Sequence, residues 1–193
     1  MVTGQKLDSA WPPFHGPQAL AHYTQAVANK KPESMTFSAG HEPVEPPVIC
    51  KIFKYIFQKY AQGQQKINFI SKIDFTGIVI NESIAELICD KFEVKRLYLK
   101  KTTRQFEQKF LPEGMQELYV SENEYFLGKS LIPVLKSQLK KLSLEKCQRV
   151  HLELLAKFVE QSETLKILSI IDCVSSFRRD GLTEFMQVIF SHR

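Results

Sequence analysis

The sequence predicts an α/β fold in which short parallel strands form one curved sheet and helices cover its convex side. Two observations lead to this prediction. One apolar motif occurs five times between residues 70 and 170, and a stretch with helical spacing of apolar residues follows each copy. A single unit of strand, turn and helix cannot bury its own apolar face, so we expect the five units to stack around one continuous core.

The motif places apolar residues at its first, fourth and sixth positions. Its copies are Ile70-x-x-Ile73-x-Phe75, Val94-x-x-Leu97-x-Leu99, Met115-x-x-Leu118-x-Val120, Leu139-x-x-Leu142-x-Leu144 and Leu165-x-x-Leu168-x-Ile170. The central apolar residues, at 73, 97, 118, 142 and 168, are therefore 24, 21, 24 and 26 residues apart. Because side chains alternate along a strand, the motif predicts strands near 73–75, 96–99, 117–120, 141–144 and 167–170.

A polar or small residue follows the last three strands at a fixed distance. Asn123, Cys147 and Cys173 each lie three positions after the final apolar residue of their copy. An Asn amide can bond to inward-facing backbone groups where the chain turns, and a thiol fits the same narrow space. We therefore expect Cys147 and Cys173 to be reduced and buried at equivalent sites. Ile78 and Thr102 stand at this position in the first two copies, which we expect to be less regular.

The predicted helices occupy residues 83–91, 105–111, 130–138, 152–161 and 181–191. With its strands, helices and repeat length, the chain resembles the leucine-rich-repeat superfamily over roughly residues 66–193. The Cys-containing copies, such as the one at 139–147, resemble repeats of F-box leucine-rich proteins and other substrate receptors of cullin ubiquitin ligases. The resemblance implies a leucine-rich-repeat solenoid of about five repeats that binds protein through its strand face.

The segment 46–65, ahead of the first repeat, contains an amphipathic helix. Apolar residues recur at helical spacing over 47–61, with lysines on the other side. Residues 46–56 resemble the first helix of an F-box, without its usual acidic residue and without a match to its second half. Two interpretations stay open. The helix caps the repeats, or it docks a ligase adaptor through Ile49, Ile52, Phe53 and Ile56. Residues 1–45, interrupted by Pro and Gly, are predicted to be a poorly ordered leader.

The strand residues between the core positions should point outward onto the concave face of the sheet. Tyr98 and Tyr119 are expected to lie side by side there, and tyrosines offer a large contact area at low entropic cost. The predicted partner-binding residues are Arg96, Tyr98, Lys100, Glu117, Tyr119, Ser143, Glu145, Ile167, Ser169 and Ile171. Ile167 and Ile171 are apolar at positions expected to meet water, which suggests a partner contact or further sequence beyond residue 193.

Composition and motifs exclude several classes of function. The 193 residues carry a net charge of +5 and contain no Gly-rich phosphate loop, paired metal-ligand spacing or nucleophile motif. We therefore expect no enzyme activity, small-molecule substrate, cofactor or metal. No apolar run approaches the roughly 18 residues of a membrane span, and no secretory signal is visible, so the expected location is cytoplasmic or nuclear.

The sequence thus predicts a non-catalytic protein–protein interaction module. The mild positive charge is compatible with an acidic protein partner, whereas nucleic acid is not expected, because no basic stripe interleaved with aromatics is visible. One alternative is a substrate receptor or adaptor of a cullin-type ubiquitin ligase. The other is an assembly factor or structural subunit of a larger complex, with no link to ubiquitin.

Overall fold

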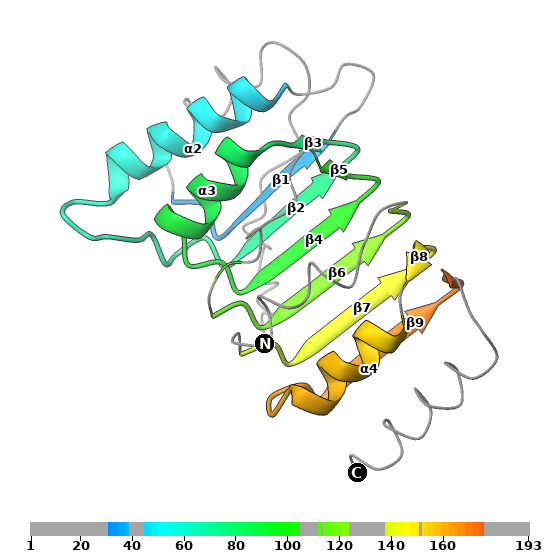
Figure 1. The fold of residues 1–193 in the computed structure, drawn as a ribbon. Helices are drawn as coiled ribbons and strands as arrows, with labels where there is room; N and C mark the ends of the chain where they lie inside the picture. Colours follow the sequence, from blue (N-terminus) through cyan, green and yellow to red (C-terminus); the bar gives the residue numbers. More distant parts are fainter. Residues whose placement is uncertain are drawn as a thin grey trace, which may run out of the picture.

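The computed structural model describes residues 31–38, 45–104, 112, 114–123, 138–150 and 152–175. Its centre is a six-stranded parallel sheet whose strands lie in the order of the chain (Figure 1). These strands are β1 (Ser34–Ser38), β2 (Lys72–Thr76), β4 (Arg96–Lys100), β6 (Glu117–Ser121), β7 (Lys141–Glu145) and β9 (Ile167–Ile171). Two small sheets pair β3 (Val79–Ile80) with β5 (Thr103–Arg104), and β8 (Gln148–Val150) with β10 (Val174–Ser175).

The five strands that the motif predicts are present and parallel, so the prediction of an α/β fold with a parallel sheet is confirmed. Their central apolar residues pair in one unbroken register across the sheet. Ile73 lies opposite Leu97, Leu97 opposite Leu118, Leu118 opposite Leu142, and Leu142 opposite Leu168. The chain therefore returns to the same register after each of the four intervals measured in the sequence.

Strand β1 is a sixth member of the sheet that the sequence analysis had counted within the leader of residues 1–45. It pairs in parallel with β2 and buries Met35 and Phe37 almost completely. The alternation of polar and apolar residues over Ser34–Ser38 is typical of a half-buried strand. The other leader residues, except 31–33 and 45, lie outside the described part of the chain.

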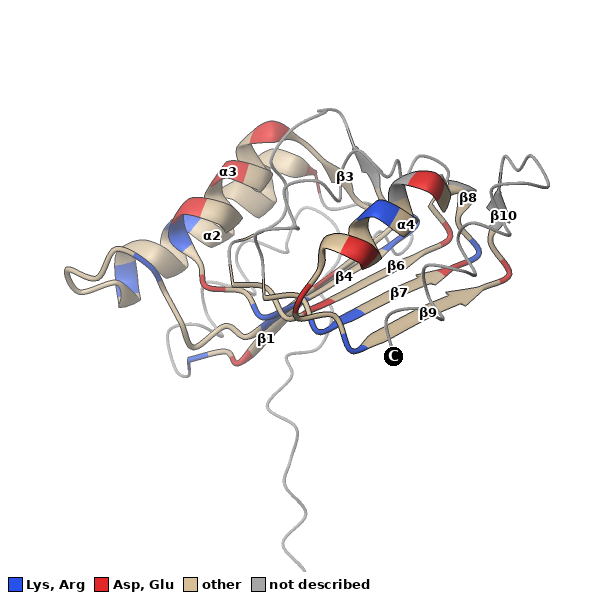
Figure 2. Cartoon of the chain, turned by 60° about the horizontal axis from the view of Figure 1, so that its bottom comes forward, with Lys and Arg blue, Asp and Glu red and all other residues tan. Residues whose placement is uncertain are grey.

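Three helices lie on one side of the sheet, and the opposite side carries no described helix (Figures 1 and 2). They are α2 (Pro46–Tyr60), α3 (Glu82–Lys91) and α4 (Leu152–Gln161), which agree with the predictions for 47–61, 83–91 and 152–161. Asn81 caps α3, because its side chain accepts a 3.0 Å hydrogen bond from the backbone N–H of Ile84. The helices predicted at 105–111, 130–138 and 181–191 fall outside the described residues, apart from Gln138.

A cluster of aromatic rings forms the core where α2 meets the sheet. The ring centroid of Phe37 in β1 lies 5.4 Å from that of Phe53 in α2 and 5.4 Å from that of Phe75 in β2. Phe92, which ends α3, contacts Phe53 at 5.0 Å in an edge-to-face arrangement. Helix α2 is therefore fixed to the first two strands by the packing of large apolar side chains.

In the six-stranded sheet, the residue that follows each strand from β2 to β9 has a left-handed backbone. These residues are Gly77, Lys101, Glu122, Lys146 and Asp172, with φ between 50° and 69°. Four of them donate their N–H to the carbonyl of the last residue of the next strand, at 2.8–3.0 Å. Only the first is a glycine, so four non-glycine residues adopt a conformation that is uncommon for them. A common hydrogen-bonded turn thus ends the successive strands.

The last strand departs from the predicted burial. Ile167 and Ile171 are exposed, as expected, at 51% and 48%. Ile170, however, occupies a predicted core position and is still 36% exposed, and Leu168 is only partly buried. Strand β9 is an edge strand, as β1 is, but the core residue Phe37 of β1 contacts Phe53 of α2, whereas Ile170 of β9 stays exposed.

Candidate binding face of the sheet

Helix α2 does not offer the apolar surface that adaptor docking would need. Ile49, Ile52, Phe53 and Ile56 are all buried to within 1% of complete burial. The side chains that α2 exposes belong to Pro47, Lys51, Lys54 and Gln58. The four residues assigned to adaptor docking are therefore core residues here, because they pack against the first strands and α3.

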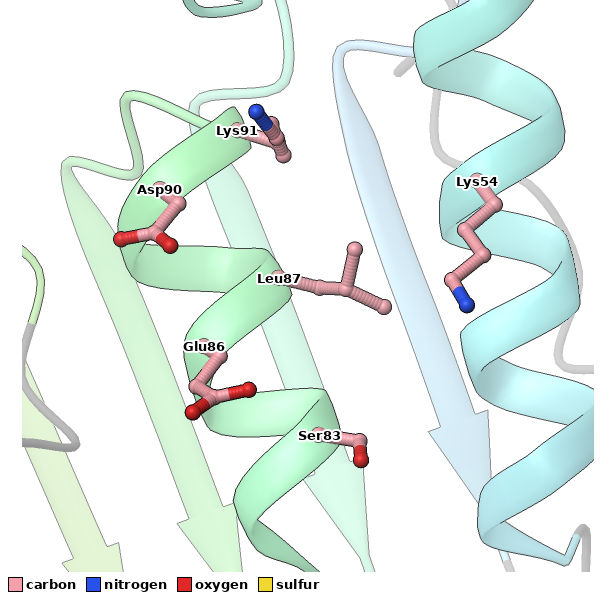
Figure 3. A pocket seen from close by; sticks show the side chains of 6 residues that line it. All are labelled: Lys54, Ser83, Glu86, Leu87, Asp90 and Lys91. Carbon is pink, nitrogen blue, oxygen red and sulfur yellow. The ribbon is translucent and has the colours of Figure 1, made fainter.

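A shallow groove separates α2 from α3. It has a volume of about 210 Å³ and is lined by Lys54, Ser83, Glu86, Leu87, Asp90 and Lys91 (Figure 3). Leu87 points toward α2, and the rest of the lining consists of Ser83 and charged side chains of both signs. The groove thus combines mixed charge with the apolar surface of Leu87 and of the lysine and carboxylate side-chain stems.

The face of the sheet opposite the helices carries every predicted partner-binding residue. Because the strands share one register, the outward side chains form three rows across it. The row at the amino ends is Ser34, Lys72, Arg96, Glu117, Lys141 and Ile167; the middle row is Thr36, Asp74, Tyr98, Tyr119, Ser143 and Ser169; the row at the carboxyl ends is Ser38, Thr76, Lys100, Ser121, Glu145 and Ile171. All eighteen are at least partly exposed.

Tyr98 and Tyr119 form a stacked pair at the centre of this face. Their ring centroids are 4.2 Å apart and their planes differ by 6°. The ammonium group of Lys72 lies 4.3 Å from the Tyr98 centroid, and that of Lys141 lies 4.9 Å from the Tyr119 centroid. Four consecutive strands thus contribute a lysine, two tyrosines and a lysine to one continuous stack, held by ring stacking and cation–π attraction.

The tyrosine hydroxyls are held in their protonated form. Tyr119 donates a 3.0 Å hydrogen bond to Oε2 of Glu117. Burial is the main cause that raises the pKa of Tyr98, and the hydrogen bond with Tyr119 raises it further. Burial also raises the pKa of Tyr119, and the bond to Glu117 adds to this. Both hydroxyls are therefore hydrogen-bonding groups without charge at neutral pH.

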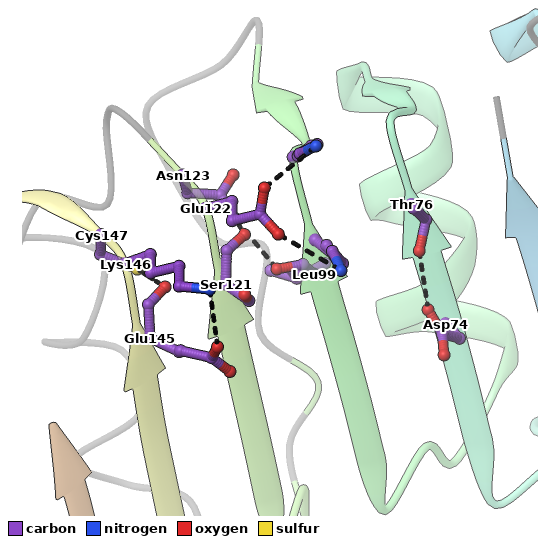
Figure 4. Close-up of polar contacts among 11 residues, drawn as sticks. Asp74, Thr76, Leu99, Ser121, Glu122, Asn123, Glu145, Lys146 and Cys147 are labelled. Carbon is purple, nitrogen blue, oxygen red and sulfur yellow. Dashed lines mark hydrogen bonds and ion pairs between the residues drawn. The ribbon is translucent and has the colours of Figure 1, made fainter. Parts of the chain in front are cut away.

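Beside the tyrosines, Asp74 is a half-buried carboxylate with weak partners. Its Oδ2 lies 3.8 Å from Nζ of Lys72, and its Oδ1 accepts a 3.4 Å hydrogen bond from the Thr76 hydroxyl (Figure 4). Burial raises the pKa of Asp74, and the opposing effects of Lys72 and Thr76 are smaller. The lysine is therefore shared between the carboxylate and the Tyr98 ring.

At the carboxyl ends of the strands the charges are paired. Glu122 accepts contacts from Lys100 at 3.2 Å and from Lys101 at 3.0 Å (Figure 4). Hydrogen bonds from these two lysines lower the pKa of Glu122, with Lys101 the larger cause. Lys146 lies 3.7 Å from Glu145. These exposed pairs contribute little stability each, but they leave this edge electrically balanced.

Beneath that edge, Asn123 and Cys147 occupy the equivalent turn positions that the sequence predicts. Asn123 is buried and donates to the carbonyl oxygens of Leu99 and Ser121, each at 2.9 Å (Figure 4). Its Oδ1 accepts a 2.9 Å hydrogen bond from the Thr102 hydroxyl. The fully buried Cys147 thiol lies 3.4 Å from the carbonyl oxygen of Val120. Amide and thiol thus bind the backbone of the preceding strand in the same way.

The cysteines are all free thiols, but they differ in burial. Burial raises the pKa of Cys147 to about 11. Cys173, expected to be buried at the next equivalent position, is only partly buried, and its thiol contacts the carbonyl of Ile171 at 3.5 Å. The prediction of burial is therefore correct for Cys147 and wrong for Cys173, which follows the incompletely covered strand β9.

The cation–π contacts of Lys72 and Lys141 were not predicted, although the sequence contained a usable pattern. In the register, Lys72 lies opposite Arg96, two residues before Tyr98, and Lys141 lies opposite Glu117, two residues before Tyr119. Such diagonal neighbours on one face of a sheet are within reach of long and aromatic side chains. Lys72 of β2 therefore reaches diagonally over the Tyr98 ring on β4, and Lys141 of β7 reaches diagonally over the Tyr119 ring on β6.

Two further properties concern chemistry and location. Within the described residues, no group of three or more His, Cys, Asp or Glu side chains is arranged to hold a metal ion. The helices of the described part are too short or too polar to cross a membrane. Comparisons with protein-family models, curated protein sequences and solved structures find no match to this chain.

Proposed function

We propose that this chain is a non-catalytic protein-interaction module of the leucine-rich-repeat type, which binds its partner on the face of the sheet opposite the helices. The observation that carries the proposal is the stack of Lys72, Tyr98, Tyr119 and Lys141 at the centre of that face. Hot spots of protein interfaces are enriched in tyrosine and arginine near the centre of the contact. Because the stack is already held on four strands, its side chains lose little conformational entropy when a partner binds.

Three properties support the assignment to a leucine-rich-repeat solenoid. The strands follow each other in chain order and share one register. A left-handed residue follows each strand of the six-stranded sheet from β2 to β9. Asn123 and Cys147 bond to the backbone of the preceding repeat. Repeats of about 20–29 residues with Asn or Cys at this position are the pattern of the superfamily.

In this proposal helix α2 acts as the amino-terminal cap, and the chain works as a scaffold or assembly factor. Repeat arrays need a terminal element that covers the first open face of the core. The burial of Ile49, Ile52, Phe53 and Ile56, together with the polar outer face of α2, supports this role. It speaks against docking of a ligase adaptor through these four residues.

The test compares affinity purifications of the wild-type chain and of the double variant Tyr98→Ala/Tyr119→Ala, followed by measurement of Kd for the partner recovered. We expect the variant to lose at least about 2 kcal/mol of binding free energy, or about 30-fold in Kd. Point variants are preferable to deletion of residues 1–61, because β1 and α2 contribute Phe37 and Phe53 to the core.

Two controls accompany this test. Tyr55→Ala removes an equally large ring from α2, away from the sheet face, and should leave Kd unchanged. Leu118→Ala empties a fully buried position and should lower the free energy of unfolding by about 2–5 kcal/mol. A partner that binds the double tyrosine variant as tightly as the wild type would exclude this face as the binding site.

A further inference from the structure

The two ends of the strands in the six-stranded sheet differ in charge. At the amino ends, the first residue of each strand and the residue before it include six basic side chains: Lys72, Lys95, Arg96, Lys140, Lys141 and Lys166. We call these six residues the amino-end row. The acids at the same positions are Glu33 and Glu117. Figure 2 shows the basic residues gathered where the strands begin.

The carboxyl ends of the same strands carry balanced charge, in contrast to the amino ends. In the six-stranded sheet, the last residue of each strand from β2 to β9 and the residue after it include three basic side chains, Lys100, Lys101 and Lys146, and three acidic ones, Glu122, Glu145 and Asp172. All three lysines there lie within 4 Å of a carboxylate. The positive charge of the face is therefore concentrated at the amino ends.

The amino-end row is not neutralised by its own chain. Among the described residues, Lys72 is the one member within ion-pair distance of an acid, at 3.8 Å from Asp74. Glu117, the acid inside the row, accepts the hydrogen bond of Tyr119. Lys95, Arg96, Lys140 and Lys166 are exposed to solvent. A ligand with negative charge would thus meet cations that are available for pairing.

The geometry of the stacked tyrosines distinguishes between two classes of anionic partner, single-stranded nucleic acid and acidic protein. Single-stranded nucleic acid binds such surfaces by stacking bases on aromatic ring faces. Here the inner faces of Tyr98 and Tyr119 cover each other, and the outer faces are covered by Lys72 and Lys141. Ring edges, which carry partial positive charge, and ammonium groups remain for a partner. This arrangement favours carboxylates over bases.

We propose that the amino-end row binds an acidic protein segment that runs across the strands. The proposal rests on the proposed function and specifies the chemistry of the partner. Lys95 and Arg96, where β4 begins, form one cluster, and Lys140 and Lys141, where β7 begins, form the next, with Glu117 of β6 between them. Two strand spacings separate the clusters, or roughly 10 Å. In a segment with polyproline II conformation, which has three residues per turn and rises roughly 3.1 Å per residue, acidic residues three positions apart lie on one side and match both clusters.

The experiment uses the full chain and a fluorescently labelled peptide of about ten residues with Glu at every third position and Ser elsewhere, long enough to cross most of the sheet. Anisotropy titrations give its Kd at low and at physiological salt. A second peptide carries Gln in place of each Glu, and a third probe is a single-stranded oligonucleotide of similar length. We expect the Glu peptide to bind, its affinity to fall with added salt, and the Gln peptide not to bind.

Two matched variants locate the binding. Lys95→Gln/Lys140→Gln removes two exposed charges from the amino-end row. It should raise the Kd of the Glu peptide at least about fivefold, which corresponds to the loss of two exposed ion pairs. Lys101→Gln/Lys146→Gln removes the same charge from the carboxyl ends, where these two exposed lysines pair with Glu122 and Glu145. It should change Kd by less than about twofold. Thermal unfolding verifies that both variants fold.

Each outcome decides the proposal. If both variants weaken peptide binding equally, binding depends on the net charge of the chain and not on the amino-end row. If the oligonucleotide binds more tightly than the Glu peptide, and does so through Lys95 and Lys140, the surface binds nucleic acid. Either result overturns the proposal. Absence of Glu-peptide binding overturns it too. If the purified partner still depends on Tyr98 and Tyr119 in that case, the interaction-module function stands and only the acidic segment is refuted.

Discussion

The ring of Tyr98 lies 4.2 Å from that of Tyr119 on the neighbouring strand, and the two planes are parallel within 6°. The two tyrosines are 21 positions apart in the sequence and directly opposite each other in the register of β4 and β6. Their contact joins two successive repeats of the motif on the surface, while Leu97 and Leu118 join the same repeats in the core. The pair therefore links the candidate binding face to the packing of the sheet.

We predict that these two tyrosines are coupled energetically. A double-mutant cycle of Tyr98→Ala and Tyr119→Ala, measured by denaturant unfolding, should give a coupling free energy of about 0.5–1.5 kcal/mol. As a control, Tyr98→Ala and Ser169→Ala lie in the same row but three strands apart, and their effects should be additive within about 0.5 kcal/mol. A coupling energy of zero for the tyrosines would mean that the stack does not persist in solution.

Asn123 should be a major contributor to stability, because it bonds to two carbonyl oxygens and one hydroxyl from a buried position. Asn123→Leu would leave the Leu99 carbonyl without this partner and should lower the free energy of unfolding by at least about 2 kcal/mol. Asn123→Cys introduces the residue found at the equivalent position 147 and should cost less. The idea of equivalent positions fails if chemical denaturation ranks the two variants in the reverse order.

Cys147 and Cys173 should respond differently to the same substitution. Cys147→Asp places a carboxylate in a fully buried site next to carbonyl oxygens, and it should destabilise the fold by a few kcal/mol, about 2–5. Cys173→Asp introduces the same group at a partly exposed site and should cost clearly less. Melting temperatures measured at pH 7 compare them directly, and an unchanged value for Cys147→Asp would contradict its burial.

The raised pKa of Cys147 predicts a dependence of stability on pH. Its ordinary value is 9.0, and burial raises it to about 11 in the folded chain. The folded state therefore holds the proton more tightly than the unfolded state, so the corresponding stability is fully present below pH 9 and is lost as the pH rises through 11. The difference in unfolding free energy between wild type and Cys147→Ala should shrink over this range, whereas a constant difference would refute the shift.

The positions of the strands could be predicted because the apolar positions of the motif are the positions whose side chains are buried in each strand. A residue such as Leu118 must be apolar in every copy, since a polar side chain there would lose its hydration without a partner. The same rule made the outward positions of Tyr98 and Tyr119 predictable. The turn position of Asn123 followed from the hydrogen-bonding capacity of its amide.

Other features required the three-dimensional arrangement. Strand β1 is as long as the other strands of its sheet, but Met35 precedes its partner Ile73 by 38 residues, outside the interval of 21–26 residues that identified the other strands. The burial of Phe53 depends in part on that strand, because Phe37 contacts Phe53. The amino-end row is not visible in the linear sequence, because Lys95 and Lys140 come near each other only when β4, β6 and β7 lie side by side.

The identity between strand order in the sheet and strand order in the chain has a kinetic consequence. Each strand finds its partner among residues made just before it, so loops closed during folding are short and their entropic cost is low. The sheet can grow by addition of one strand at a time onto the aromatic nucleus around Phe37, Phe53 and Phe75, in the direction in which a ribosome would deliver the chain.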